Sequence, residues 1–312
     1  MKRIQNRISE SRFTLPVIAV YGAAVWCAAG LPGEQWWVQF ACFVASTYLM
    51  MELNNSNALI RIYSRMVSCA FIVLSSSVAF MFASVSQAVA AMCVLASYLL
   101  LFRTYQDRAA MGRTFYAYLF IGLGAMAYPE TLYFVPALWL LSIFCLQAPS
   151  WRNFFASVFG LLTPYWFAAV WFIYQEDFPL PMTHFARLAE VTLPPDYGHL
   201  TLKHALSFVY ILIIGLTGIV HYLRTSYNDK IRIRMLYQFF ITMNLLSAAL
   251  LVVMPQHYDF LLRMMIINTS PLIAHFIALT RTRVTNIAFG VITLSALMLT
   301  AYNLWASSSV LL

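Results

Sequence analysis

The residues best suited to chemistry gather in one polar segment, residues 175–203, within an otherwise apolar chain. Carboxylates, imidazoles and guanidinium groups accept protons and hold anions at active sites. Asp177 is a candidate catalytic carboxylate in this segment, and His184, Arg187 and His199 are candidate substrate contacts. Such a segment could close over a substrate, but an ordinary solvated connector has a similar composition.

Arg263 is another candidate substrate contact, because it lies only a few residues inside an apolar block. A guanidinium is costly there unless it pairs, reaches the interface or binds an anion. Asp259 lies one helical turn earlier, so a local ion pair is one interpretation. The other is a phosphate or carboxylate site that Arg263 shares with nearby His257, since arginine binds such groups through two parallel hydrogen bonds.

Glu130 follows Tyr128 and Pro129 at a tight turn, where its carboxylate could act catalytically as a general base. Acidic residues at turns are more often simply solvated, so both interpretations stay open. No histidines have the HxxH or HxxxH spacing of a metal site, and the sequence predicts neither a metal nor another cofactor.

Two further polar features call for an explanation. His275 lies deep in an apolar block, where we expect a hydrogen bond to a neighbouring helix near Asn268 or Asn244, with a proton-relay or metal role as the alternative. The asparagine-rich run ELNNSNALIR, residues 52–61, is expected to cap a helix or bond irregular backbone rather than bind a ligand.

The elements that must position these residues are hydrophobic helices. Of the 312 residues, 62% are hydrophobic and only 10% are charged, and the mean hydropathy is +0.75, whereas soluble domains carry about 25% charged residues. The apolar blocks recur at lengths that span a bilayer as helices. We therefore predict an all-α, polytopic transmembrane helical bundle that forms a single domain over residues 1–312.

About eleven spans are expected from the apolar blocks. They cover residues 13–30, 36–51, 66–84, 87–102, 114–128, 131–146, 154–174, 204–223, 237–254, 260–280 and 285–305. Alternate connections then carry all but three of the 19 basic residues, which predicts a cytoplasmic N-terminus. A cleaved signal peptide ending near residues 28–30 is the alternative for the first block and would leave ten spans.

The net charge of +8 comes from these basic loops, so we expect membrane lipids as partners rather than nucleic acid. Walker A, GxSxG and GxGxxG motifs are missing from the sequence, which leaves ATP hydrolysis, an esterase triad and dinucleotide binding without support.

Residues 52–177 resemble an uncharacterised family of polytopic membrane proteins found in Bacteroidota. The resemblance rests on the asparagine-rich run, the turn at 128–136, the Trp151-Arg152 pair and the GLLTPY segment at 160–165. It covers about two fifths of the chain. The resemblance implies a multi-pass protein of a Gram-negative inner membrane, in the cell envelope, and implies no particular activity.

Three functions fit these patterns, and whether the protein is an enzyme stays open. The first is the handling of a polyprenyl-phosphate-linked glycan at the outer face of the membrane, with Glu130 and Asp177 as catalytic carboxylates and Arg263 as a phosphate contact. The second is a transporter or lipid flippase with proline-broken helices. The third is a non-catalytic scaffold that binds a membrane-protein partner in a secretion or envelope complex.

Overall fold

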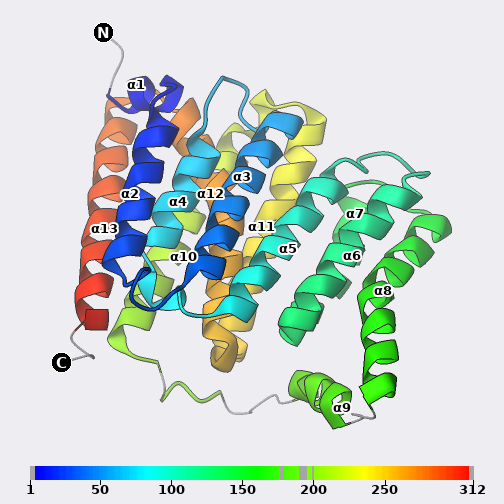
Figure 1. The fold of residues 1–312 in the computed structure, drawn as a ribbon. Coiled ribbons are helices and arrows are strands. Elements are labelled where there is room, and N and C mark those ends of the chain that lie inside the picture. The colour runs from blue at the N-terminus through cyan, green and yellow to red at the C-terminus, as the bar shows by residue number, and fades with distance from the viewer. Residues whose placement is uncertain (1–3, 176–178, 190–194, 199, 309–312) are drawn as a thin grey trace. The chain divides into compact units, whose positions relative to one another are not determined.

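The computed structural model describes residues 4–175, 179–189, 195–198 and 200–308. All regular secondary structure in these residues is helical, and they contain no strand, which confirms the all-α prediction (Figure 1). Within the described chain, six helices are long and apolar enough to cross a membrane, or seven if the bent pair at residues 4–28 counts as one span. The chain is therefore a multi-helix protein of the membrane type.

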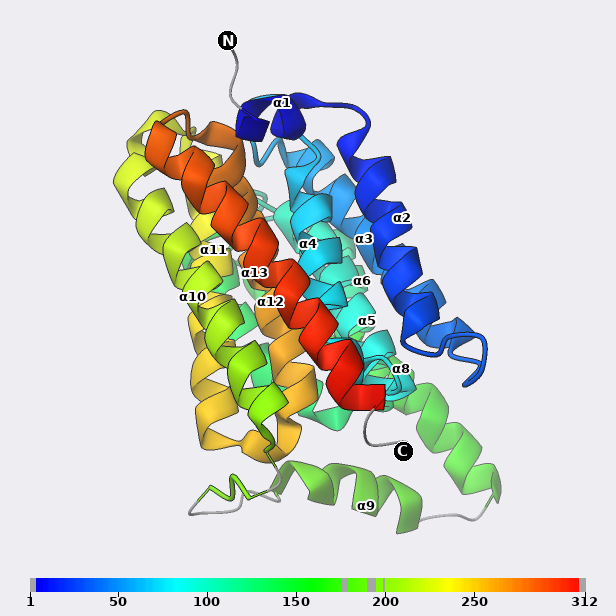
Figure 2. The ribbon, with the colours of Figure 1, turned by 90° about the vertical axis from the view of Figure 1, so that its left-hand side faces the viewer.

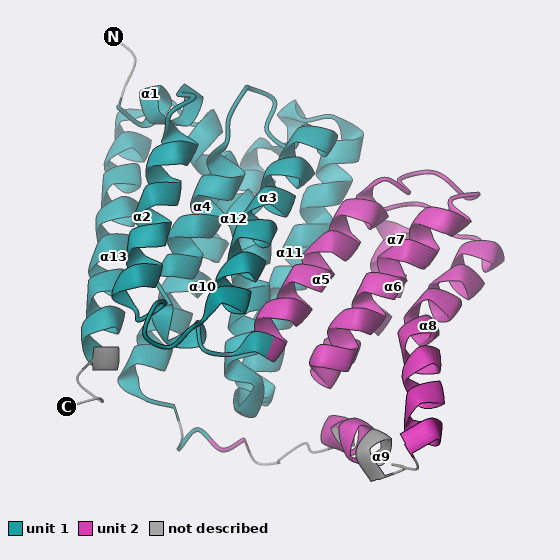
Figure 3. Cartoon of the chain, viewed as in Figure 1, with its two compact units in different colours: residues 1–85, 197–312 teal, residues 86–196 magenta. Residues whose placement is uncertain are grey.

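Contacts divide the chain into two compact units, coloured separately in Figure 3. Unit 1 comprises residues 1–85 and 197–312, and unit 2 comprises residues 86–196. A single domain over the whole chain stays a prediction.

Unit 1 is a bundle centred on one buried helix. Its elements are α1 (Ile4–Glu10), α2 (Thr14–Ala28), α3 (Trp37–Asn57), α4 (Met66–Ser76), η1 (Ala79–Met81), α10 (Leu202–Thr225), η4 (Ser226–Asn228), α11 (Ile231–Val253), η5 (Pro255–His257), α12 (Tyr258–Leu279) and α13 (Arg283–Ser308). Helix α12 packs against α10, α11, α4 and α1, and its candidate span is 94% buried. Because side chains on every face of it are buried, α12 forms the core of unit 1. Helix α13, by contrast, crosses in front of α12 in Figure 2 and is largely exposed.

The block at residues 66–84, predicted as one span, is a broken helix. Helix α4 ends at Ser76, and η1 follows. Ser77 Oγ donates to the Leu74 carbonyl at 2.7 Å, and Asn303 Nδ2 donates to the Ser77 carbonyl at 2.7 Å. Serine hydroxyls compete for helical carbonyls, and the bond from Asn303 satisfies a carbonyl that the break releases. The uninterrupted helix predicted here is wrong.

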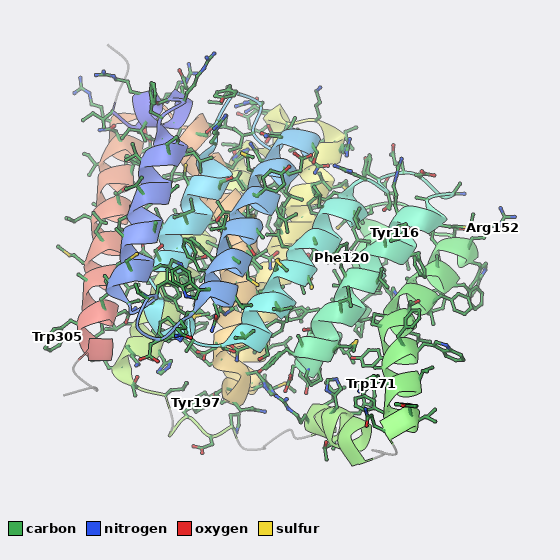
Figure 4. The ribbon with its side chains drawn as sticks, in the orientation of Figure 1. Tyr116, Phe120, Arg152, Trp171, Tyr197 and Trp305 are labelled. Carbon is green, nitrogen blue, oxygen red and sulfur yellow. The ribbon has the colours of Figure 1, made fainter. Side chains whose placement is uncertain are left out.

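Unit 2 contains α5 (Val85–Phe102), α6 (Met111–Ala127), η2 (Pro129–Phe134), α7 (Val135–Phe144), α8 (Trp151–Gln175), α9 (Pro179–Ala186) and η3 (Arg187–Ala189), with α5 beginning at the last residue of unit 1. Helices α6 and α8 pack closely because glycines remove side chains from their contact. A Cβ added to Gly122 would lie 2.6 Å from the Leu161 carbonyl oxygen, and one added to Gly160 would collide with the Phe115 backbone. Figure 4 shows Arg152 and Trp171 near the two ends of α8.

Candidate functional site

Three of the predicted site residues come together in unit 2. Glu130 is 1% exposed, and its Oε1 lies 3.2 Å from Arg187 Nη2. The charges of Glu130 and Arg187 both act on the pKa of His184. The sequence predicted these residues separately, as a turn carboxylate and as members of the polar segment, and the structure joins them in one cluster.

The Tyr128-Pro129 turn places Glu130 inside the unit. Helix α6 ends as Tyr128 becomes extended, with φ −148° and ψ 100°, and its N–H still donates to the Gly124 carbonyl at 2.8 Å. Pro129 then begins η2, where its missing N–H costs nothing because the first helical position has no intrahelical acceptor. Of the two interpretations of this turn, the solvated carboxylate is therefore wrong, because Glu130 is buried; its catalytic role stays a prediction.

Helix α9 and η3 supply the other two side chains. His184 and Arg187 are three residues apart and so share one helical face. Tyr133 Oη donates to the Leu188 carbonyl at 3.0 Å, which ties η3 to η2. The guanidinium of Arg187 also lies over the Tyr128 ring, 5.7 Å from its centroid, at a cation–π distance. Arg187 is therefore held by a carboxylate and an aromatic face, although half of its side chain stays exposed.

The surroundings of His184 favour the neutral form of its imidazole. Burial lowers the pKa of His184 from its usual 6.5, the Arg187 charge acts in the same direction, and a backbone hydrogen bond at Ala125 and the Glu130 charge oppose them. Nε2 of His184 is buried and has no hydrogen-bond partner among the described residues. The bond to Ala125 must then involve Nδ1, which leaves Nε2 as the unprotonated nitrogen and a potential proton acceptor.

An apolar cavity of about 350 Å³ lies beside His184. It is lined by residues from the end of α6, the second half of α8 and α9: Met126, Tyr165, Ala168, Ala169, Phe172, His184 and Phe185. The Tyr165 ring packs against His184, with centroids 6.1 Å apart. Sequence reasoning missed this wall because its residues resemble any other lipid-facing apolar residues. The arrangement can hold a hydrocarbon group next to a proton acceptor and a cation.

The other predicted site residues lie elsewhere or are not described. Arg263 and His257 belong to unit 1, where Arg263 Nη2 donates to the Met81 carbonyl and interacts electrostatically with Asp259. His257 is 9% exposed, in η5. Asp177 and His199 fall outside the described residues. Their proposed roles stay predictions.

Unit 1 contains a buried ion-pair geometry that the sequence did not reveal. His275 Nε2 lies 3.0 Å from Asp229 Oδ2, and the two side chains are 1% and 2% exposed. The rings of His221, Tyr222 and Tyr237 surround His275 at centroid distances of 5.0–5.5 Å. This pair joins α12 to the turn before α11.

The expected partners of His275, Asn268 and Asn244, are engaged elsewhere. Asn268 Nδ2 donates within α12 to the Met264 carbonyl, and Asn244 Nδ2 donates to Thr269 Oγ1. The asparagine-rich run is also structural, since Asn54 Nδ2 donates to the Ser64 carbonyl and Asn57 Oδ1 accepts from Arg232. His275 does bond to a neighbouring element, but the predicted partners were wrong, because the sequence gives no sign that Asp229, in a loop, is buried.

Among His, Cys, Asp and Glu side chains of the described residues, no group of three could hold a metal ion. The fold, the cluster of Glu130, His184 and Arg187 and the pair of His275 and Asp229 define a helical membrane-type protein. In unit 2 it has a buried carboxylate, a half-exposed guanidinium and an imidazole beside an apolar cavity. Comparison with known proteins adds no family to this class, since no family model, curated protein or solved structure matches the chain.

Proposed function

We propose that this chain is a multi-pass inner-membrane protein of the cell envelope that binds a polyprenyl-phosphate-linked glycan at the cluster of Glu130, His184 and Arg187. Arg187 contacts the phosphate, the apolar cavity takes the adjoining isoprenoid units, and Nε2 of His184 accepts a proton from an attacking hydroxyl. Glu130 holds Arg187 in place. The protein then catalyses transfer of the glycan from the lipid carrier. The hydroxyl oxygen bonds to the anomeric carbon of the first sugar as the bond from that carbon to the phosphate oxygen breaks. The carrier phosphate leaves with the electron pair, held by Arg187, and His184 takes the hydroxyl proton.

The proposed topology has about eleven crossings with a cytoplasmic N-terminus. A helix or a broken helix lies at each of the predicted apolar blocks, and the basic residues separate onto alternate connections. In this topology the connection that contains α9 lies on the outer face of the membrane. The site therefore faces the compartment in which envelope glycans are assembled.

One observation carries the proposal: a buried carboxylate holds a half-exposed guanidinium next to a neutral imidazole and an apolar cavity. A structural ion pair alone would need neither the cavity nor the unpartnered imidazole nitrogen. A lipid-linked phosphate needs an apolar channel and a cation together, and arginine suits a phosphate because its donors match two oxygens at once.

The test is equilibrium binding of undecaprenyl phosphate and of undecaprenol to the purified full chain. Loss of a charged hydrogen bond is worth about 1.5–3 kcal/mol, so Arg187→Gln should weaken phosphate binding about 10-fold to 100-fold and leave undecaprenol binding unchanged. Arg152→Gln is the matched control, because Arg152 is an exposed arginine of the same unit at the other end of α8. Equal affinity of wild type and R187Q for the phosphate would reject the proposal.

Transport is the second candidate function. The buried pair of His275, in α12, and Asp229, in the turn before α11, favours it, because ionisable residues that are buried within a membrane bundle mark proton and ion pathways. The break between α4 and η1 is compatible with a transporter core. Proteoliposomes would separate the two functions: protein-dependent movement of a labelled undecaprenyl phosphate that Asp229→Asn abolishes and R187Q does not would favour transport.

A further inference from the structure

Unit 1 contains an apolar crevice that is separate from the site in unit 2. It has a volume of about 580 Å³ and is lined by α1, α2, α4, α10, α12 and α13. Three of the four hydroxyls in its wall donate to backbone carbonyls: Thr14 Oγ1 to Ile8, Tyr210 Oη to Ile292 and Thr293 Oγ1 to Phe289. The fourth, Ser11 Oγ, accepts from the Phe13 N–H. The wall therefore offers an occupant hydrocarbon contacts and almost no hydrogen bonds.

The dimensions of the crevice suit a single lipid chain. Along α4 its lining runs from Met66 to Leu74, which is about 12 Å at 1.5 Å per residue. One leaflet of a bilayer contributes about 15 Å of hydrocarbon. The crevice thus extends through most of one leaflet, from the end of the bundle that carries α1 towards its middle.

Helix α1 closes one end of the crevice. It is bent by 90° from α2, and Figure 2 shows it lying across that end of the bundle. Gln5 Nε2 donates to the Ile277 carbonyl at 2.7 Å and to Thr280 Oγ1 at 2.8 Å, while Asn6 Nδ2 donates to the Thr280 carbonyl. These bonds fix the polar face of α1 to the end of α12. Ile4 and Ile8 then face the crevice.

Arg7 is the one charged residue among the described residues that line the crevice. It is exposed, and it forms no ion pair or hydrogen bond with another described residue. An exposed arginine at the end of an apolar channel, next to an interfacial helix, is placed to contact an anionic headgroup. The exposed side chains of Phe13 and Val17, 77% and 66% exposed, form an apolar entrance from the bilayer.

We infer that this crevice binds one anionic glycerophospholipid, with an acyl chain between α2, α4 and α13 and the phosphate on Arg7. The lipid enters sideways from the leaflet in which α1 lies. Its chain fills space that the side chains leave open and so joins the peripheral helices α2 and α13 to the core of unit 1. This inference does not depend on the proposed function of unit 2.

The experiment is native mass spectrometry of the full chain in mild detergent, titrated with phosphatidylglycerol and with phosphatidylcholine. Val73 lines the crevice and is partly buried, so Val73→Trp should fill the channel and abolish the tightest bound lipid. Val20→Trp is the control, because Val20 is 71% exposed on α2 and lies outside the crevice.

The headgroup contact is tested with Arg7→Gln. Basic residues near a membrane surface contribute about 1 kcal/mol each, so phosphatidylglycerol binding should weaken about fivefold while phosphatidylcholine binding changes less. Arg12→Gln is the control, since Arg12 is exposed nearby and does not line the crevice. The inference is overturned if V73W retains the lipid as wild type does, or if V20W and R12Q cause equal losses, which would indicate annular lipid only.

Discussion

The two units use polar side chains in different ways. In unit 1, His275 and Asp229 form a pair inside the bundle and Gln5 fixes α1 to α12, so the polar groups hold helices together. In unit 2, the pair of Glu130 and Arg187 is open on one side, and a cavity lies beside its neighbour His184. The difference teaches that a pair buried on both sides can join helices but leaves no room for a ligand, whereas one buried and one half-exposed partner beside a cavity mark a ligand site.

The largest effect that would test this comparison is expected at His275. His275→Ala would leave the Asp229 carboxylate buried without its partner, and removing one member of a buried pair costs about 3–5 kcal/mol. Unfolding of the detergent-solubilised protein by heat or SDS should show this loss. Asp229→Asn keeps an acceptor for the imidazole and should cost much less. An H275A variant as stable as wild type would refute the structural role of the pair.

A smaller effect should arise where α6 and α8 pack in unit 2. Gly160→Ala places a Cβ against the backbone of Phe115, and overpacking of this kind costs about 1–3 kcal/mol. Gly112, the second residue of α6, has open space around it, so Gly112→Ala should leave stability unchanged or raise it by less than about 0.5 kcal/mol. Thermal unfolding of G160A and G112A measures both changes in stability. A G160A variant more stable than wild type would contradict the close contact between α6 and α8.

The smallest expected effect tests whether folding lowers the pKa of His184. Because folding lowers the pKa of His184, the unfolded chain binds its proton more readily, and stability should fall as pH decreases from the usual 6.5 through the lowered value. His184→Gln removes this contribution. The stability of wild type relative to H184Q should therefore decline as the pH falls below the usual pKa of 6.5, while the other histidines cancel in the comparison. A pH-independent difference would mean that His184 titrates normally.

The helices could largely be predicted from the sequence, because apolar blocks of membrane length have one stable conformation in a bilayer. The break at Ser76 could not, since Asn303, far along the chain, satisfies the carbonyl of Ser77 that the break releases. A run of three serines, 75–77, was the only local signal. A local sequence pattern predicts how long an apolar segment is, but it does not predict which distant residue donates a hydrogen bond to the backbone where the helix breaks.

The candidate site was predictable in part. Glu130 stood out at its proline turn, and His184 and Arg187 stood out as candidate substrate contacts in the polar segment at residues 175–203. The pairing of Glu130 with Arg187, 57 residues apart, depends on how η2 and η3 pack. Asp229 was missed for the same reason, because its burial against His275 is a tertiary event that loop composition does not reveal.

The central claim is that the cluster of Glu130, His184 and Arg187 binds a lipid-linked phosphate, and the most direct test is a cryo-EM map of the full chain with added undecaprenyl phosphate. We predict phosphate density within hydrogen-bonding distance of Arg187, with isoprenoid density in the cavity beside Tyr165 and His184. An empty cavity, with Arg187 bonded only to Glu130 at saturating lipid, would contradict the claim.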